Sequence, residues 1–297
     1  MGKYKEKILD LLKEQFINVV GPRTFQQGSV ARSYYLEQLN DNLYQPMSKS
    51  VLNAYSKGSG NEIKSGKRPA KMSSIRSSSA LTYNLFLNNN VKFGGRYGRI
   101  GKGEYSVEFE KQFRTLKSSK TPANLDAYLF CADTGEAIAC EMKMIEWIFN
   151  KPRTLKKAYF DSNKYFDSGD VFVNIANDLQ SSEITRYDAS QMFKHAVACY
   201  NAICTSEKDK VKKLTLVNCV WTLSNSNLLG DDEFKYIERE KLELKEFNEF
   251  KKIMEPLKDL FKSKGVDFDI VFYTFNDFLN LIDKTQAELD YLERYKL

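Results

Sequence analysis

The sequence predicts an α/β protein in which helices flank a mixed central sheet. Apolar runs with strand character occur at 104–113, 213–223 and 267–275, and two more surround a turn within 122–146. An apolar stripe with helical spacing predicts a helix at 185–204, between the hairpin and the next strand. With a helix before the first strand, the order becomes helix, three strands, helix, strand.

The N-terminal part is predicted to be mostly helical. Residues 3–20 place their apolar side chains on one face, and 28–43 predict a second helix. Between 45 and 71 the composition changes to Ser, Gly, Asn and Lys, which indicates either a solvated loop or a basic, glycine-rich arm that follows a phosphate backbone. Serines at the start of 73–89 are suited to cap a buried helix there.

The segments after the hairpin surround the two remaining strands. A polar helical stretch runs to about residue 167, residues 170–177 indicate a short strand or a helix edge, and 276–295 predict a last amphipathic helix. Residues 235–264 predict a long helix broken near Pro256, with alternating charges typical of a solvated face. No repeat or Pro-rich or Ser-rich linker divides the chain, so we expect one domain. Its parts are N-terminal helices at 1–45, the core at 46–280 and the end of the C-terminal helix at 281–297.

Composition limits the class of protein. Hydrophobic residues make up 42% of the 297, and 20 Phe and 17 Tyr favour a globular chain over a disordered one. No segment approaches 18 apolar residues and the N-terminus lacks the apolar run of a signal peptide, so we expect a cytoplasmic protein without a membrane partner. Five cysteines in apolar contexts favour reduced core thiols. The formal charge of +6 permits a nucleic-acid partner without requiring one.

One face of the predicted hairpin concentrates charge. If Ala132 pairs with Gly135, Asp126 lies opposite Glu141, and a three-residue loop moves that match by one position. Either register places the two carboxylates within roughly 5–8 Å, and strand alternation puts Lys143 on the face of Glu141. Mg²⁺ or Mn²⁺ prefers such oxygen ligands, and a neighbouring lysine can hold water and stabilise negative charge. The pattern predicts a divalent-metal and phosphate site, with surface ion pairs on an exposed hairpin as the plain alternative.

The pattern of Asp126 with Glu141-x-Lys143 resembles the PD-(D/E)xK nuclease superfamily, whose restriction-endonuclease-like fold has an αβββαβ core. The literal Pro-Asp pair is absent, because Pro122 stands four residues before Asp126. The string AYSKGSGNEI…KMSSIRSSSALTYNLF looks like one that precedes the catalytic hairpin in a bacterial branch of that superfamily. The resemblance spans roughly residues 50–280. It implies a Mg²⁺-dependent endonuclease that hydrolyses double-stranded DNA, such as a restriction or mobile-element-defence enzyme, and it leaves a homodimer open.

The resemblance also implies roles for individual residues. Asp126 and Glu141, helped by the Met142 carbonyl, would hold the metal, and Lys143 would position the attacking water. Accessory residues are then expected at Glu110 (favoured over Glu108) on the strand before the hairpin, at Gln191 on the helix after it, at Glu62, and at Ser78 and Ser79, whose helix start would face phosphate. Helix capping alone would also explain the serines.

A basic, glycine-rich segment precedes the first of these strands. Residues 92–103, KFGGRYGRIGKG, contain five glycines and the basic side chains of Lys92, Arg96, Arg99 and Lys102. Because glycine lets backbone approach a ligand closely, we predict that this loop contacts the nucleic-acid backbone. A plain long loop is the alternative.

The sole histidine and the rival functions complete the sequence-based predictions. His195 lies one helical turn after Gln191, where packing or hydrogen bonding is the simpler interpretation and an accessory role beside the metal is the other. No acid and serine accompany it as a Ser-His-Asp set would require.

A nucleic-acid-binding protein that does not cut, or an interaction domain with structural acids, remains the rival to a nuclease.

Overall fold

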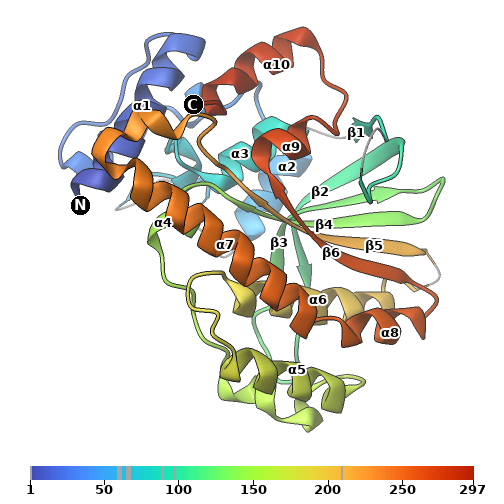
Figure 1. The fold of residues 1–297 in the computed structure, drawn as a ribbon. Helices are drawn as coiled ribbons and strands as arrows, with labels where there is room; N and C mark the ends of the chain where they lie inside the picture. The colour runs from blue at the N-terminus through green and yellow to red at the C-terminus, as the bar shows by residue number, and fades with distance from the viewer. Residues whose placement is uncertain (1, 59–61, 65–67, 88–89, 96–97, 209) are drawn as a thin grey trace.

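A mixed β-sheet forms the centre of the computed structural model, which describes residues 2–58, 62–64, 68–87, 90–95, 98–208 and 210–297 (Figure 1). Within these ranges the sheet has six strands in chain order, the first three pairs antiparallel and the last two parallel. The strands are β1 (Asn90–Phe93), β2 (Gly103–Phe113), β3 (Ala123–Cys131), β4 (Glu136–Lys143), β5 (Lys213–Val220) and β6 (Asp267–Thr274). The α/β class and the mixed sheet predicted from the sequence are therefore confirmed.

The β3–β4 hairpin follows from its turn. Gly135 adopts a φ of +70°, which glycine tolerates without strain, and its N–H donates to the Cys131 carbonyl at 3.0 Å. Strand pairing runs from Cys131 opposite Glu136 to Ala127 opposite Cys140. This is the register in which Ala132 pairs with Gly135, and its continuation places Asp126 opposite Glu141.

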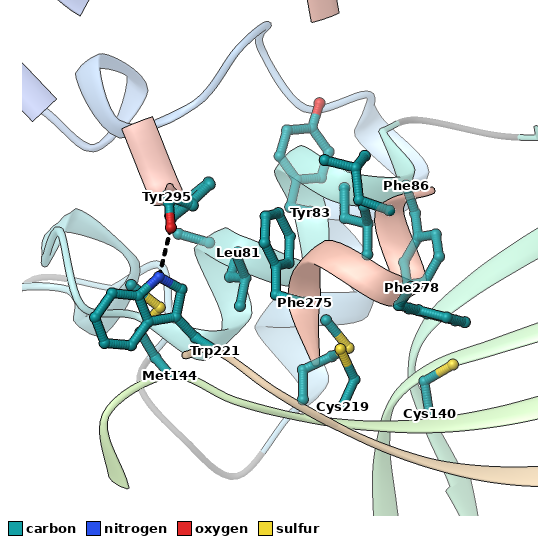
Figure 2. Packing of buried hydrophobic residues seen from close by; sticks show 14 of the residues in the cluster. Leu81, Tyr83, Phe86, Cys140, Met144, Cys219, Trp221, Phe275, Phe278 and Tyr295 are labelled. Carbon is teal, nitrogen blue, oxygen red and sulfur yellow. Dashed lines mark hydrogen bonds between the residues drawn. The ribbon is translucent and has the colours of Figure 1, made fainter. Parts of the chain in front are cut away.

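Helices from both ends of the chain, together with the short helix after β4, cover one face of the sheet. They are α1 (Lys3–Val20), α2 (Lys49–Lys57), α3 (Ser78–Phe86), α4 (Glu146–Phe149), α9 (Phe275–Leu279) and α10 (Gln286–Leu292). Figure 2 shows Leu81 and Phe278 from two of these helices above Cys140 and Cys219 of the sheet. The indole N–H of Trp221 donates to the Tyr295 carbonyl at 2.6 Å, which joins the chain end to the exit of β5 (Figure 2).

The other face is covered by the middle of the chain (Figure 1). Its helices are α5 (Gly169–Ser181), α6 (Ala189–Ile203), α7 (Glu233–Ile253) and α8 (Pro256–Lys262). Helix α6 lies directly against β2, β3 and β5, with Phe193 and Val197 in the same apolar cluster as Leu216. Pro256 begins α8, which is the predicted break in the long charged helix.

Several local predictions were wrong. The predicted helix at 28–43 is replaced by two 3₁₀ turns, and isolated β-bridges of Phe25 with Leu36 and of Tyr35 with Ser74 interrupt it. The predicted loop at 45–71 contains α2, and the last helix is interrupted between α9 and α10. The described 3₁₀ turns are Val30–Arg32, Leu39–Asn42, Lys71–Ser73, Lys157–Phe160, Ser162–Lys164, Ser226–Asp232 and Glu293–Tyr295.

The segments after the hairpin also depart from prediction. Helix α4 ends at Phe149 and only two 3₁₀ turns follow it before residue 167, while 170–177 belongs to α5. Helix α7 is not simply solvated, because its own charged residues Arg239, Glu243 and Glu246 are buried. None of the described helices is long and apolar enough to cross a membrane.

Candidate active site

Strands β3 and β4 present two acids and a lysine. The Lys143 ammonium donates to Glu141 Oε1 at 2.6 Å, and Glu141 is only 3% exposed. Asp126, on β3, accepts the Met142 N–H through Oδ2 at 2.7 Å. In a strand the N–H and C=O of one residue point toward the same neighbour, so the Met142 carbonyl is also directed toward β3. The neighbouring strands β3 and β4 thus bring together the predicted residues Asp126, Glu141, Met142 and Lys143.

Helix α6 contributes the side-chain amide of Gln191, which hydrogen-bonds to both Glu141 and Lys143. Asp188 caps the helix by accepting the Gln191 N–H at 3.2 Å. The Gln191 side chain donates to Glu141 Oε1 at 2.8 Å and accepts from the Lys143 ammonium at 2.7 Å. Because one amide contacts both partners, Gln191 sets the distance and orientation of the Glu141–Lys143 pair.

The Glu141–Lys143 pair is ionised at neutral pH. Burial on its own raises the pKa of Glu141, but Lys143 and His195 outweigh it and lower that pKa to about 2. Burial likewise lowers the pKa of the Lys143 ammonium, and Glu141 with Asp188 more than reverses this, so that its pKa lies above the ordinary value. Lys143 is therefore a hydrogen-bond donor and a fixed positive charge, and is unsuited to act as a general base at neutral pH.

The pKa values of two other carboxyl groups, those of Asp126 and Glu110, are raised. Burial, followed by repulsion from Glu141 and Glu110, raises the pKa of Asp126 well above its ordinary value. Burial and the neighbouring Glu62 raise the pKa of Glu110 to about 7. These shifts mean that the carboxylates share a confined space in which their negative charges are not fully balanced.

The two glutamates of β2, Glu108 and Glu110, have different surroundings. Glu108 is exposed and bonds to Lys111 at 2.7 Å. Glu110 instead accepts from the Asn124 amide and forms the acid cluster together with Glu62, Asp126 and Glu141. Glu110 has a φ of +51°, so the regular alternation of side chains is interrupted there. Phe109 and Phe113 accordingly lie in different apolar clusters, although simple alternation would put them on one face.

Glu62 and the serines come from the segment before the sheet. Glu62 accepts from Lys71 at 3.0 Å and from the Ser79 hydroxyl at 3.0 Å, so Ser79 is engaged by an acid. The N-cap of α3 is Ser77, which accepts the Ala80 N–H at 3.1 Å. Ser78 is the first residue of α3 and is partly exposed.

The predicted basic loop lies at the other end of β4. The Gly101 N–H donates to the Glu136 carboxylate, and Arg99 is already paired with Asp267 at 3.0 Å. Glu136 precedes Glu141 by five residues, which is about 16 Å along a strand. Lys92 and Lys102 are exposed, and Arg96 lies outside the described residues. The structure therefore does not bring this loop to the acid cluster.

The donor set suits a hard divalent cation. In the described ranges no three His, Cys, Asp or Glu side chains already surround one metal position. The available atoms are nevertheless oxygens of Asp126, Glu110 and Glu141, together with Asn124 Oδ1, which is buried without a hydrogen-bond partner among the described residues. Mg²⁺ commonly binds through one or two carboxylates and keeps several waters, so it does not need a complete protein cage. The residues present fit such an ion.

Sequence reasoning missed three contributors to the site. They are Asn124, which donates to Glu110; Asp188, which caps α6 beside Lys143; and Lys71, which neutralises part of Glu62. Asn124 stands two positions before Asp126, and Asp188 stands three before Gln191 at the capping position. These two spacings were signals in the sequence, whereas the Lys71–Glu62 pair carried none.

Comparisons with known proteins add no assignment. No protein-family model matches the chain, and neither a curated protein nor a solved structure matches it.

Proposed function

We propose that this protein is a metal-dependent phosphodiesterase that cleaves double-stranded DNA, with a restriction-endonuclease-like core. The observation that supports this most strongly is the convergence of Asp126, Glu141, Lys143 and Gln191 from two strands and a helix. A structural ion pair would need only Glu141 and Lys143. The addition of Asp126 and Glu110 with raised pKa values favours a site that takes up a cation.

In the proposed mechanism the chain supplies three functions. Asp126 and Glu141, with the Met142 carbonyl and Glu110, hold Mg²⁺ or Mn²⁺. When bound, the metal activates water and neutralises charge that develops on phosphorus. The Lys143 ammonium orients the attacking water and stabilises the extra negative charge of the transition state. Gln191 keeps Lys143 and Glu141 in this arrangement.

The sequence resemblance agrees with a restriction or defence endonuclease. Such an enzyme would act in the cytoplasm, as a monomer or as a homodimer. Contacts of Lys92, Arg96, Arg99 and Lys102 with DNA remain a prediction. Arg99 is already paired with Asp267. Of the described basic residues in this loop, Lys92 and Lys102 have exposed side chains that are available to contact DNA. A duplex bound at the acid cluster would have to extend about 16 Å, or roughly five base pairs, to reach them.

The decisive experiment is cleavage of supercoiled plasmid with Mg²⁺ or with EDTA. We expect Mg²⁺-dependent cutting, and Lys143→Ala should lower the rate by about 10²-fold or more, because it removes a donor to the transition state. Lys111→Ala is the matched control, since Lys111 pairs with Glu108 outside the acid cluster.

Two outcomes would contradict the proposal. Plasmid that is shifted but uncut in both buffers would identify a nucleic-acid-binding protein that does not cleave. Cutting by Lys143→Ala at the wild-type rate would show that this lysine is structural.

A further inference from the structure

His195 has a defined contact in the acid cluster. It lies on α6 one turn after Gln191, and its Nε2 is 2.8 Å from Glu141 Oε2. The other two donors to Glu141, Lys143 and Gln191, both bind Oε1. His195 is thus the neighbour that restrains the second oxygen and, with it, the rotation of the carboxylate.

The geometry also defines the tautomer of His195. A carboxylate only accepts hydrogen bonds, so the proton must be on Nε2. In the neutral ring Nδ1 is then an acceptor, and this atom is buried without a partner in the described part of the chain. A neutral ring that donates to Glu141 therefore carries its proton on Nε2.

Burial excludes direct chemistry by this histidine. His195 is 2% exposed, and its Nε2 is already engaged with the Glu141 carboxylate. A general acid or base must reach the proton that it transfers, directly or through one water. A ring enclosed in this way acts on a reaction through Glu141.

We propose that His195 is a positioning residue, whose Nε2–H holds the Glu141 carboxylate in the orientation needed to bind the divalent metal. This rests on the proposed phosphodiesterase function and adds a residue whose role is exerted through Glu141. Groups that orient metal ligands typically contribute 10–100-fold to metal affinity or activity.

Three substitutions separate positioning from packing. His195→Gln keeps an amide donor near the place of Nε2. His195→Asn has an amide near the place of Nδ1 and is too short to reach Glu141, and His195→Leu keeps apolar volume without a donor. We expect the Mn²⁺ dissociation constant, followed by electron paramagnetic resonance, to rise 10–100-fold in the Asn and Leu variants and less than about 3-fold in the Gln variant.

Cleavage kinetics and a double variant complete the test. In the Asn and Leu variants kcat should fall 10–100-fold with an unchanged KM for DNA, because no DNA-contacting surface is altered. In a Glu141→Ala background, His195→Leu should change Mn²⁺ affinity little, since the carboxylate on which it acts is gone. Melting temperatures of all variants identify any that are merely unfolded.

The outcomes distinguish this inference from the proposed function. If the wild type binds Mn²⁺ and cuts DNA but His195→Leu equals it, or His195→Gln is as impaired as His195→Leu at the same melting temperature, the positioning role is wrong. If the wild type binds Mn²⁺ with the expected His195 dependence but never cuts, the positioning role stands and the nuclease function is wrong. If it neither binds Mn²⁺ nor cuts, both are wrong.

Discussion

At the scale of single residues, the acid cluster combines carboxyl groups with opposite electrostatic environments. Glu141 is stabilised as an anion by three donors, and its pKa is about 2. Asp126 has one backbone donor and two acidic neighbours, so its charged form is disfavoured. Such crowding lowers stability and is commonly found where a protein binds a cation or performs chemistry.

Asp126→Asn should separate stability from activity. The amide keeps an acceptor for the Met142 N–H and removes the charge repelled by Glu141 and Glu110. In EDTA at neutral pH we expect stability to rise by about 1 kcal/mol, or about 2 °C in melting temperature. Cleavage should fall at least about 10²-fold, because a metal ligand is lost.

Asp178→Asn, on the exposed side of α5, is the control and should change neither quantity. A variant at Asp126 that is less stable than the wild type in EDTA would show that this carboxylate is structurally required.

At the scale of elements, α7 holds the two segments that border the site. Arg239 donates to the Trp147 carbonyl after β4 and to the Glu243 carboxylate. Glu246 accepts the N–H groups of Thr185, Arg186 and Tyr187 at 2.9, 2.8 and 2.6 Å, just before α6 begins. The position of Gln191 and His195 therefore depends on a helix that does not itself touch the acid cluster.

Glu246→Gln tests this anchoring. The amide loses charge-assisted bonds and turns an N–H toward backbone donors, so we expect a loss of about 2–3 kcal/mol in urea unfolding at pH 7. Although burial raises the pKa of Glu246, the three backbone donors outweigh it and lower that pKa. Its stabilisation is thus present above the ordinary value of 4.5 and is lost as pH falls through the lower folded-state value.

The difference between Glu246→Gln and the wild type should accordingly shrink in acid. Glu238→Gln, an exposed substitution on the same helix, should stay within about 0.5 kcal/mol of the wild type. Faster hydrogen exchange at the start of α6 should accompany the loss at Glu246, and unchanged exchange there would argue against anchoring.

At the scale of the whole molecule, one sheet separates two apolar clusters, and the acid cluster lies on β2, β3 and β4, where Gln191 and His195 of α6 contact Glu141. Glu110 has a folded-state pKa of about 7, above the ordinary 4.5, so the folded protein binds more protons than the unfolded chain between these values. Stability must then decrease as pH rises through that window.

We expect the free energy of unfolding in EDTA to fall between pH 4.5 and 7, by at most about 3 kcal/mol from Glu110. Mg²⁺ should offset this fall because it binds only the folded state. The buried Glu243 also has a pKa of about 7 but lies on α7, so its contribution should not respond to Mg²⁺. An equal pH slope in Glu110→Gln, measured by urea unfolding, would exclude Glu110 as the source.

Much of the architecture could be predicted because it is encoded locally. The turn signal at Asp133-Thr134-Gly135 located the β3–β4 hairpin and limited its register to two alternatives, and strand alternation placed Lys143 beside Glu141. The helix at 28–43 could not be recognised as wrong, because Tyr35 pairs in a bridge with Ser74, which lies outside any local window. Local periodicity predicts which residues are buried, but it does not predict which distant residues they pack against.

The sequence by itself determined that a hairpin would carry Asp126, Glu141 and Lys143 on one face and limited its register to two alternatives, since these features depend on neighbours in the chain. Only the tertiary structure decided that Glu110 joins the acids and Glu108 does not, because a φ of +51° at a glutamate leaves no signature in residue type. It also decided that His195 holds Glu141, that Glu246 anchors α6, and that Arg99 lies at the far end of β4. Each of these contacts joins residues at least 54 positions apart, where only folding brings the partners together.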